Sequence, residues 1–95
     1  MAKHDWTEAD DIAAFYVYRF GTERLGNTIT EVDVARSCDI GLDSFRMRIR
    51  NFRALDGKGG LVNWAAQSQE VYRRYQLADE ETLRRLFIET RSKPL

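Results

Sequence analysis

The chain has 95 residues, of which 43% are hydrophobic and 32% are charged, and its 15 basic and 15 acidic side chains cancel. This length predicts a single domain over 1–95, and the composition excludes a disordered segment. No apolar run approaches the roughly 20 residues of a membrane-spanning helix, and no signal-peptide pattern is present, so we expect a cytoplasmic protein without a membrane partner. With one cysteine, Cys38, and one histidine, His4, we expect no disulfide, metal site or cofactor.

The basic side chains are distributed unevenly along the chain. Residues 1–40 hold four basic and eight acidic side chains, residues 41–60 hold five and two, and residues 61–95 hold six and five. Twelve of the basic residues are arginine, whose planar guanidinium suits forked contacts with phosphate or guanine. The neutral total therefore hides one basic segment, at 41–60.

The first helix is predicted over about 7–20, where the sequence reads "TEADDIAAFYVYRF". Thr7 is a suitable N-cap, Asp10 stands where the acid of a capping box would, and Gly21 ends the helix. Apolar side chains occur on most sides of this helix, so we expect most of its surface to be buried.

A short second helix is predicted over about 31–38, with Thr30 as its N-cap. Val32, Ala35 and Cys38 are expected to face inward, at the spacing of one helical face. The periodicity then breaks at "DIGLD", where Gly41 lies.

The third helix is predicted from about Ser44 to Leu55, capped by Asp43 or Ser44. A short helix, a turn of about four residues and a second helix form the outline of a helix-turn-helix over about 31–55, in which the second helix would lie in the major groove of DNA. Ile40 and Leu42 would fill the angle between the two helices.

The last part of the chain predicts a loop and two more helices. "DGKGG" at 56–60 is rich in glycine and predicts a turn. Helical periodicity returns over about 64–76, and Asp79 is a suitable cap for a fifth helix over about 79–91. The sequence therefore predicts an all-α fold, a compact domain of four to five helices.

The helix over 44–55 presents two kinds of surface. At about 100° per residue, Phe45, Ile49 and Phe52 share one side, which predicts a face directed at the core. An adjacent face without an acid carries three arginines: Arg46, Arg50 and Arg53. Arg48 lies on the other flank of the apolar stripe, and Met47, Asn51 and Ala54 are expected to look outward. A solvated face more often mixes charges, so this arrangement favours an anionic partner.

Three other features of the sequence do not predict a functional site. The "GKGG" segment lacks the spacing of a phosphate-binding loop. The doublets Arg73-Arg74 and Arg84-Arg85 have acidic neighbours, which predicts ordinary surface ion pairs. His4 has no second ligand nearby and is expected to be solvated.

Three segments, "WTEADDIAAFYVY", "SFRMRIRNFRALDGKGGLVN" and "EVYRRY", carry a resemblance to a known family. Together they resemble the small helix-turn-helix-like module that precedes the nuclease domain in bacterial HNH restriction-type endonucleases. The resemblance covers about residues 6–75 and implies a DNA-binding accessory. Since the chain has no room for a nuclease domain, it resembles a stand-alone copy of the module, of the kind that phages and mobile elements encode.

The sequence thus predicts a non-catalytic protein that binds double-stranded DNA, either a small transcriptional regulator or a DNA-binding accessory. The residues predicted to contact DNA are Ser44, Arg46, Arg50, Asn51, Arg53 and Lys58. A palindromic site would need a homodimer, for which the C-terminal helices over about 64–91 offer a surface. The alternative is a protein-binding adaptor or inhibitor that acts on a bacterial defence complex, which the neutral net charge and the acidic first third favour.

Overall fold

The computed structural model describes residues 5–59 and 63–91. Its helices are α1 (Glu8–Phe20), the single 3-10 turn η1 (Glu23–Leu25), α2 (Glu31–Ser37), α3 (Leu42–Leu55), α4 (Ala66–Tyr75) and α5 (Glu80–Arg91). The part of the chain that the structure describes contains no strand, so the predicted all-α class is confirmed. None of these helices is long and apolar enough to cross a membrane.

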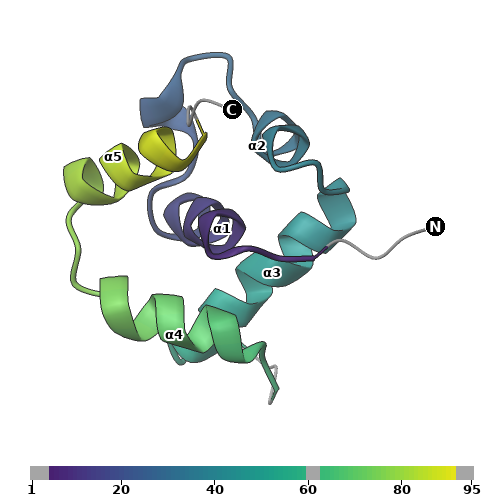
Figure 1. Ribbon diagram of the computed structural model, residues 1–95, viewed down its shortest axis with the longest axis vertical. Helices are drawn as coiled ribbons and strands as arrows, with labels where there is room; N and C mark the ends of the chain where they lie inside the picture. Colours follow the sequence, from purple (N-terminus) through teal and green to yellow (C-terminus); the bar gives the residue numbers. More distant parts are fainter. Residues whose placement is uncertain (1–4, 60–62, 92–95) are drawn as a thin grey trace.

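Helix α1 forms the centre of the fold. Figure 1 shows it nearly end-on, with α5 on one side, α3 on the opposite side, and α2 and α4 between them. Every residue from Asp10 to Val17 is buried, which confirms that most sides of this helix are covered. The predicted capping box is also present, because the Asp10 amide donates to the Thr7 hydroxyl at 3.1 Å and the Thr7 amide donates to the Asp10 carboxylate at 3.1 Å. Gly21, at φ 74°, ends the helix.

Aromatic rings join α1 to three of its neighbours. The ring centroids of Phe15 and Phe52 are 4.9 Å apart, which links α1 to α3. Phe15 also contacts Tyr72 of α4, at 5.9 Å, and Tyr16 contacts Phe87 of α5, at 5.7 Å. Because these rings are large and mostly removed from water, they supply much of the hydrophobic stabilisation of the core.

Helix α2 begins as predicted but faces the core differently. Thr30 caps it in a second capping box, which the side chain of Asp33 completes. Ala35 and Cys38 are buried as predicted, but Val32 is 39% exposed and Val34 is buried instead. The prediction for Val32 is therefore wrong. It lies about 200° around the helix from Val34, so only one of the two can face inward.

Helix α3 starts two residues earlier than predicted. Its N-cap is Gly41, without a side-chain hydrogen bond, so neither Asp43 nor Ser44 caps it. Ile40 is buried as the chain turns, and its amide donates to the carbonyl of Ala35 at 2.9 Å, which closes the turn before Gly41. The start of α3 is therefore held by backbone hydrogen bonds and by the burial of Ile40, and not by a polar side-chain cap.

The predicted core face of α3 is confirmed, with one addition. Phe45 and Phe52 are fully buried, and Ile49 is partly buried against the core. Ala54 was predicted to look outward but is buried. The chain after α3 folds back over it, so that a side chain at Gly59 would meet the Ala54 backbone at 3.2 Å.

Helices α4 and α5 match the predicted ranges to within two residues. Trp64 lies before α4 rather than inside it, and its indole donates to Gln69 at 3.2 Å. Asp79 caps α5 as predicted, because its carboxylate accepts from the Thr82 amide at 2.8 Å. Leu83 is fully buried on the inner side of this helix.

Replacing Phe52 with alanine should lower the free energy of unfolding by ~3–5 kcal/mol, because the ring is fully buried at the contact between α1 and α3. Urea denaturation followed by circular dichroism measures this loss. The matched change on the exposed side of the same helix, Arg50→Ala, should stay within about 0.5 kcal/mol of the parent protein. Equal losses in the two variants would show that the orientation of α3 is wrong.

Candidate nucleic-acid interface

A buried ion pair fixes how α3 is rotated. Arg48 donates from Nε to Asp11 Oδ1 at 2.7 Å and from Nη2 to Asp11 Oδ2 at 2.8 Å. The Arg48 side chain is 14% exposed and that of Asp11 is 0% exposed. Gln67 and Ser68 of α4 donate to the same carboxylate at 2.6 and 2.8 Å, and the Trp6 ring lies 4.4 Å from the guanidinium carbon. One carboxylate of α1 thereby holds α3 and α4 together.

This arrangement decides which arginines of α3 face solvent. Positions 46, 50 and 53 lie about 140–200° around the helix from Arg48, so when Arg48 points inward they point outward. All three are exposed in the structure, as predicted. They border a shallow depression between α3 and the start of α2, lined by Glu31, Arg46, Ile49, Arg50 and Arg53.

The face of α3 that carries Arg46, Arg50 and Arg53 is not free of acids, contrary to the expectation from the sequence. Arg46 donates from Nε to Glu31 Oε1 at 3.0 Å, and the two side chains are 55% and 40% exposed. The expectation that no acid lies on this face is therefore wrong, because Glu31 reaches across from α2. In addition, α3 begins early enough to include the exposed Asp43, which shares a helix side with Arg46 and Arg50. Arg50 and Arg53 have no carboxylate within ion-pair distance among the residues that the structure describes, and the same holds for Arg36 on α2.

The three other predicted contact residues differ in what they offer to a partner. Ser44 is exposed in the first turn of α3, beside the arginine face. The amide of Asn51 is engaged at both ends, since it donates to the Met47 carbonyl at 3.0 Å and accepts from the Ala65 amide at 2.8 Å. The ammonium group of Lys58 is exposed but lies 3.4 Å from a carboxylate oxygen of Asp56. Ser44 and the arginines are thus the groups most accessible to a ligand.

Asp56 anchors the C-terminal end of α3. Tyr18 of α1 and Tyr72 of α4 donate their hydroxyl groups to its two carboxylate oxygens, at 2.7 and 2.9 Å. The hydrogen bond from Tyr18 lowers the pKa of the Asp56 carboxyl, and Tyr72 and Lys58 lower it further. Burial, together with the bond to Asp56, raises the pKa of Tyr18 to about 12. This end of the arginine face is therefore held by two other helices.

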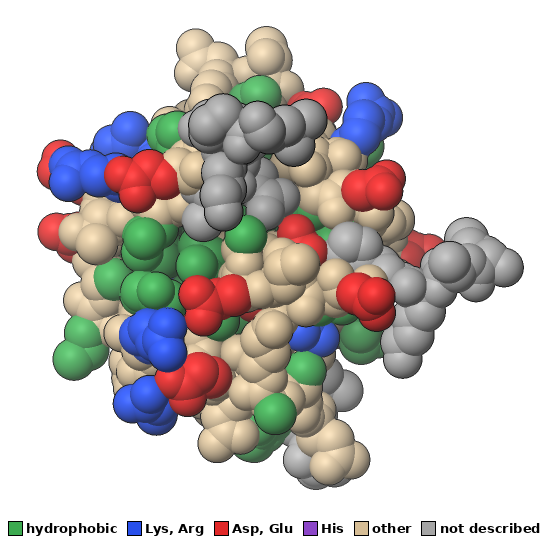
Figure 2. All heavy atoms as spheres, in the orientation of Figure 1, with side chains coloured by type: hydrophobic (Ala, Val, Ile, Leu, Met, Phe, Trp, Pro, Cys, Tyr) green, Lys and Arg blue, Asp and Glu red, His purple; other side chains and the backbone are tan. Residues whose placement is uncertain are grey.

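The arginine doublets of α4 and α5 form ion pairs, as predicted. Figure 2 shows acidic and basic side chains next to one another on the side of the molecule where these helices lie. The pairs join Arg73 and Arg74 to Glu70, Arg74 to Glu8, Arg84 to Glu80, and Arg85 to Glu81. Their charges are compensated within the protein, which separates them from Arg50 and Arg53.

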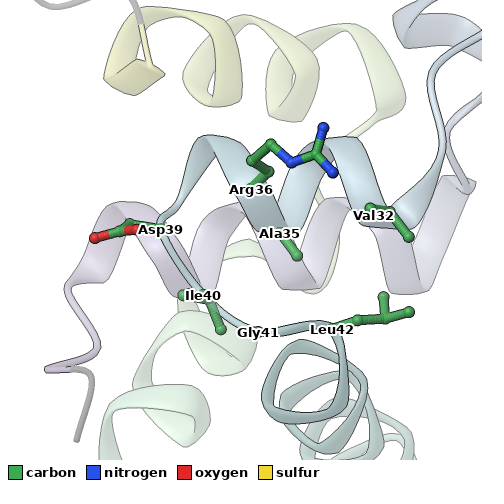
Figure 3. Close-up of a pocket in the computed structure, with 7 residues that line it drawn as sticks. All are labelled: Val32, Ala35, Arg36, Asp39, Ile40, Gly41 and Leu42. Carbon is green, nitrogen blue, oxygen red and sulfur yellow. The ribbon is translucent and has the colours of Figure 1, made fainter. Parts of the chain in front are cut away.

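A second depression, of about 360 Å³, lies in the angle between α2 and the start of α3. Figure 3 shows Val32 of α2 and Leu42 of α3 at the same end of it, with Asp39 at the opposite end. Ile40 was expected to fill this angle and is buried, whereas Leu42 is only half-buried. The depression is lined by Val32, Ala35, Arg36, Asp39, Ile40, Gly41 and Leu42.

No group of three or more His, Cys, Asp or Glu side chains in the described part of the chain is placed to hold a metal ion. The predicted solvation of His4 falls outside the described residues. Comparison of the chain with protein-family models, with curated proteins and with solved structures gives no match. The resemblance to the module of HNH endonucleases therefore stays an expectation from the sequence.

Replacing Arg48 with alanine should lower the free energy of unfolding by about 3–5 kcal/mol, because it leaves the buried carboxylate of Asp11 without its counter-charge. Arg46 provides a matched control on the same helix, since it is also paired with an acid of another helix but is exposed. Arg46→Ala should cost at most about 1 kcal/mol. Chemical denaturation measures both, and similar losses would contradict the distinction between a buried and a surface pair.

Replacing Tyr18 with phenylalanine should raise the pKa of the Asp56 carboxyl toward its ordinary value of 3.8, because the strongest hydrogen bond to it is lost. Since the folded pKa is lowered, this interaction stabilises the fold above pH ~3.8, and the stabilisation disappears as the pH falls through the folded pKa. A carboxyl-carbon NMR titration of Asp56 measures the shift. Tyr75→Phe, which removes a hydroxyl that does not contact Asp56, should leave that titration unchanged.

Proposed function

We propose that this chain is a non-catalytic protein that binds double-stranded DNA through the exposed face of α3. The observation that carries the proposal is that Arg50 and Arg53 are exposed without a carboxylate partner among the described residues, while each arginine of the α4 and α5 doublets has one. Arginines left unpaired on one helix face repel one another slightly, and an anionic partner removes that cost. A phosphate backbone supplies such a partner at regular spacing.

The order of helix α2, turn and helix α3 supports a helix-turn-helix mode of binding. In that mode the second helix enters the major groove and contacts base edges near its N-terminal end, where Ser44 and Arg46 lie. Helix α3 has 14 residues and is about 21 Å long, and the major groove is wide enough to admit a helix. Arg50 and Arg53 would then reach phosphates at the edge of the groove, as a regulator or a DNA-binding accessory requires.

A palindromic DNA site would require two copies of the chain. We propose α5 as the surface for this pairing, because Ile88 is an exposed apolar side chain there. Acidic and basic residues surround Ile88, among them the pair Glu81 and Arg85. In a dimer, the acidic residues of one α5 could therefore lie opposite the basic residues of the other.

A protein-binding adaptor or inhibitor is the second candidate function. It is favoured by the exposure of Val32 and Met47, two apolar side chains on α2 and α3. Val32 also lines the depression shown in Figure 3, which a hydrophobic side chain of a protein could enter. The neutral net charge fits such a partner as well as it fits DNA.

Replacing Arg50 or Arg53 with alanine should weaken binding to every duplex sequence and reduce the slope of log affinity against log salt by about one unit, because one phosphate contact is lost. Fluorescence anisotropy with a labelled random-sequence duplex, between about 50 and 200 mM salt, measures both effects. Arg46→Ala should also impair binding.

Arg85→Ala is the matched control for these variants. Arg85 is an exposed helix arginine like the others, but it is paired with Glu81 and lies away from α3. It is preferable to Arg84, whose partner Glu80 also accepts a hydrogen bond from Tyr16. The control should bind like the parent protein. If the parent protein has no salt-dependent affinity for duplex DNA, the proposal fails and the adaptor function takes its place.

A further inference from the structure

The three exposed arginines of α3 differ in how they are held. Arg46 is bonded to Glu31 through Nε alone, at 3.0 Å, and no hydrogen bond of its Nη1 or Nη2 group occurs among the described residues. Arg50 and Arg53 have neither an ion pair nor a hydrogen bond to their guanidinium groups there. One arginine of the face is therefore oriented by the protein before any ligand arrives, and the other two are not.

Glu31 is itself placed to do this. It stands in the first turn of α2, where the helix cap uses a different acid, since Asp33 accepts from both the amide and the hydroxyl of Thr30, at 2.9 and 3.1 Å. The carboxylate of Glu31 is thus not part of the cap of its own helix. It extends instead to α3, where it lines the same depression as Arg50 and Arg53.

The pairing also changes which ligand suits Arg46. A guanidinium and the carboxylate beside it form a pair with almost no net charge, and the carboxylate repels a phosphate that approaches the same place. Guanine offers two neutral acceptors, O6 and N7, with the spacing of the Nη1–Nη2 end of an arginine. Since Glu31 leaves that end unoccupied, the pair fits the edge of a guanine better than it fits a phosphate.

We propose that Arg46 reads a guanine in the major groove, that Glu31 positions it through Nε, and that Arg50 and Arg53 contact phosphates. This assignment rests on the proposed function, because it takes duplex DNA as the ligand. It divides the arginine face into one specificity-determining residue and two that supply affinity independent of sequence.

The division can be tested with two matched alanine substitutions, each of which removes one guanidinium and one positive charge from α3. The parent protein, Arg46→Ala and Arg50→Ala would each be used to select duplexes from a random-sequence pool, and the enriched sequences compared. Arg50→Ala should bind more weakly but enrich the same guanine position as the parent protein. Arg46→Ala should also bind the pool more weakly but lose that preference, with a drop in discrimination of roughly 5- to 150-fold at one base pair.

Two changes at Glu31 separate its hydrogen bond from its charge. Glu31→Gln keeps an oxygen that can accept from Arg46 Nε, so the guanine preference should persist while affinity for all sequences rises. Glu31→Ala removes the acceptor, so the preference should fall although the charge change is the same. A role in folding alone would not distinguish the two variants in base preference.

The outcomes also distinguish this assignment from the proposed function. A parent protein that enriches no duplex at all would overturn both. If the parent protein binds DNA and Arg46→Ala keeps its guanine preference, the assignment of Arg46 is overturned and DNA binding stays in place. Loss of the preference in Arg50→Ala instead would move the reading role to Arg50.

Discussion

The contact between Asp11 and Arg48 is the constraint on which the arrangement of the helices depends. It joins the central helix α1 to α3, and the two α4 side chains that share the carboxylate bring the third helix to the same point. Because the guanidinium is held at two atoms, α3 cannot rotate about its own axis without breaking the pair. The exposed positions of α3, and with them the candidate interface, follow from this single orientation.

A buried ion pair contributes more to orientation than to net stability. Removing two charges from water costs nearly as much as their attraction returns, and well-packed apolar groups often serve equally well for stability. Helix α3 carries four arginines within eight residues, at 46, 48, 50 and 53. An apolar contact in place of Asp11 would not determine which of these arginines points inward. The Asp11 carboxylate accepts four hydrogen bonds, two of them from Arg48. Arg48 lies beside the apolar stripe of α3, so its methylene groups can pack along the core while its guanidinium reaches the carboxylate.

Local patterns in the sequence predict the helices correctly but do not predict the contacts between the helices. Caps and periodicity depend on residues three or four apart, so the sequence predicts Thr7, Thr30 and Asp79 as caps and every α-helix boundary to within two residues. Asp11 and Arg48 are 37 residues apart, and Glu31 and Arg46 are 15 apart, so no local pattern reports them. One usable signal was present, because Asp11 shares a helix face with the apolar side chains at 15 and 18.

The neutral charge of the chain bears less on DNA binding than it first suggests. Screening at physiological salt limits interactions between exposed charges to about 8 Å, so a phosphate responds to the groups nearest to it and not to the total. Among the described residues, six exposed or half-exposed arginines each pair with an acid on the surface, and such pairs carry little net charge. On the exposed side of α3 the charges of Arg50 and Arg53 are then opposed by Asp43 alone, beside the balanced pair of Glu31 and Arg46. If the proposed function is correct, an interface built this way would attract DNA only at short range, and base contacts would supply a larger share of the binding energy than at a strongly basic surface.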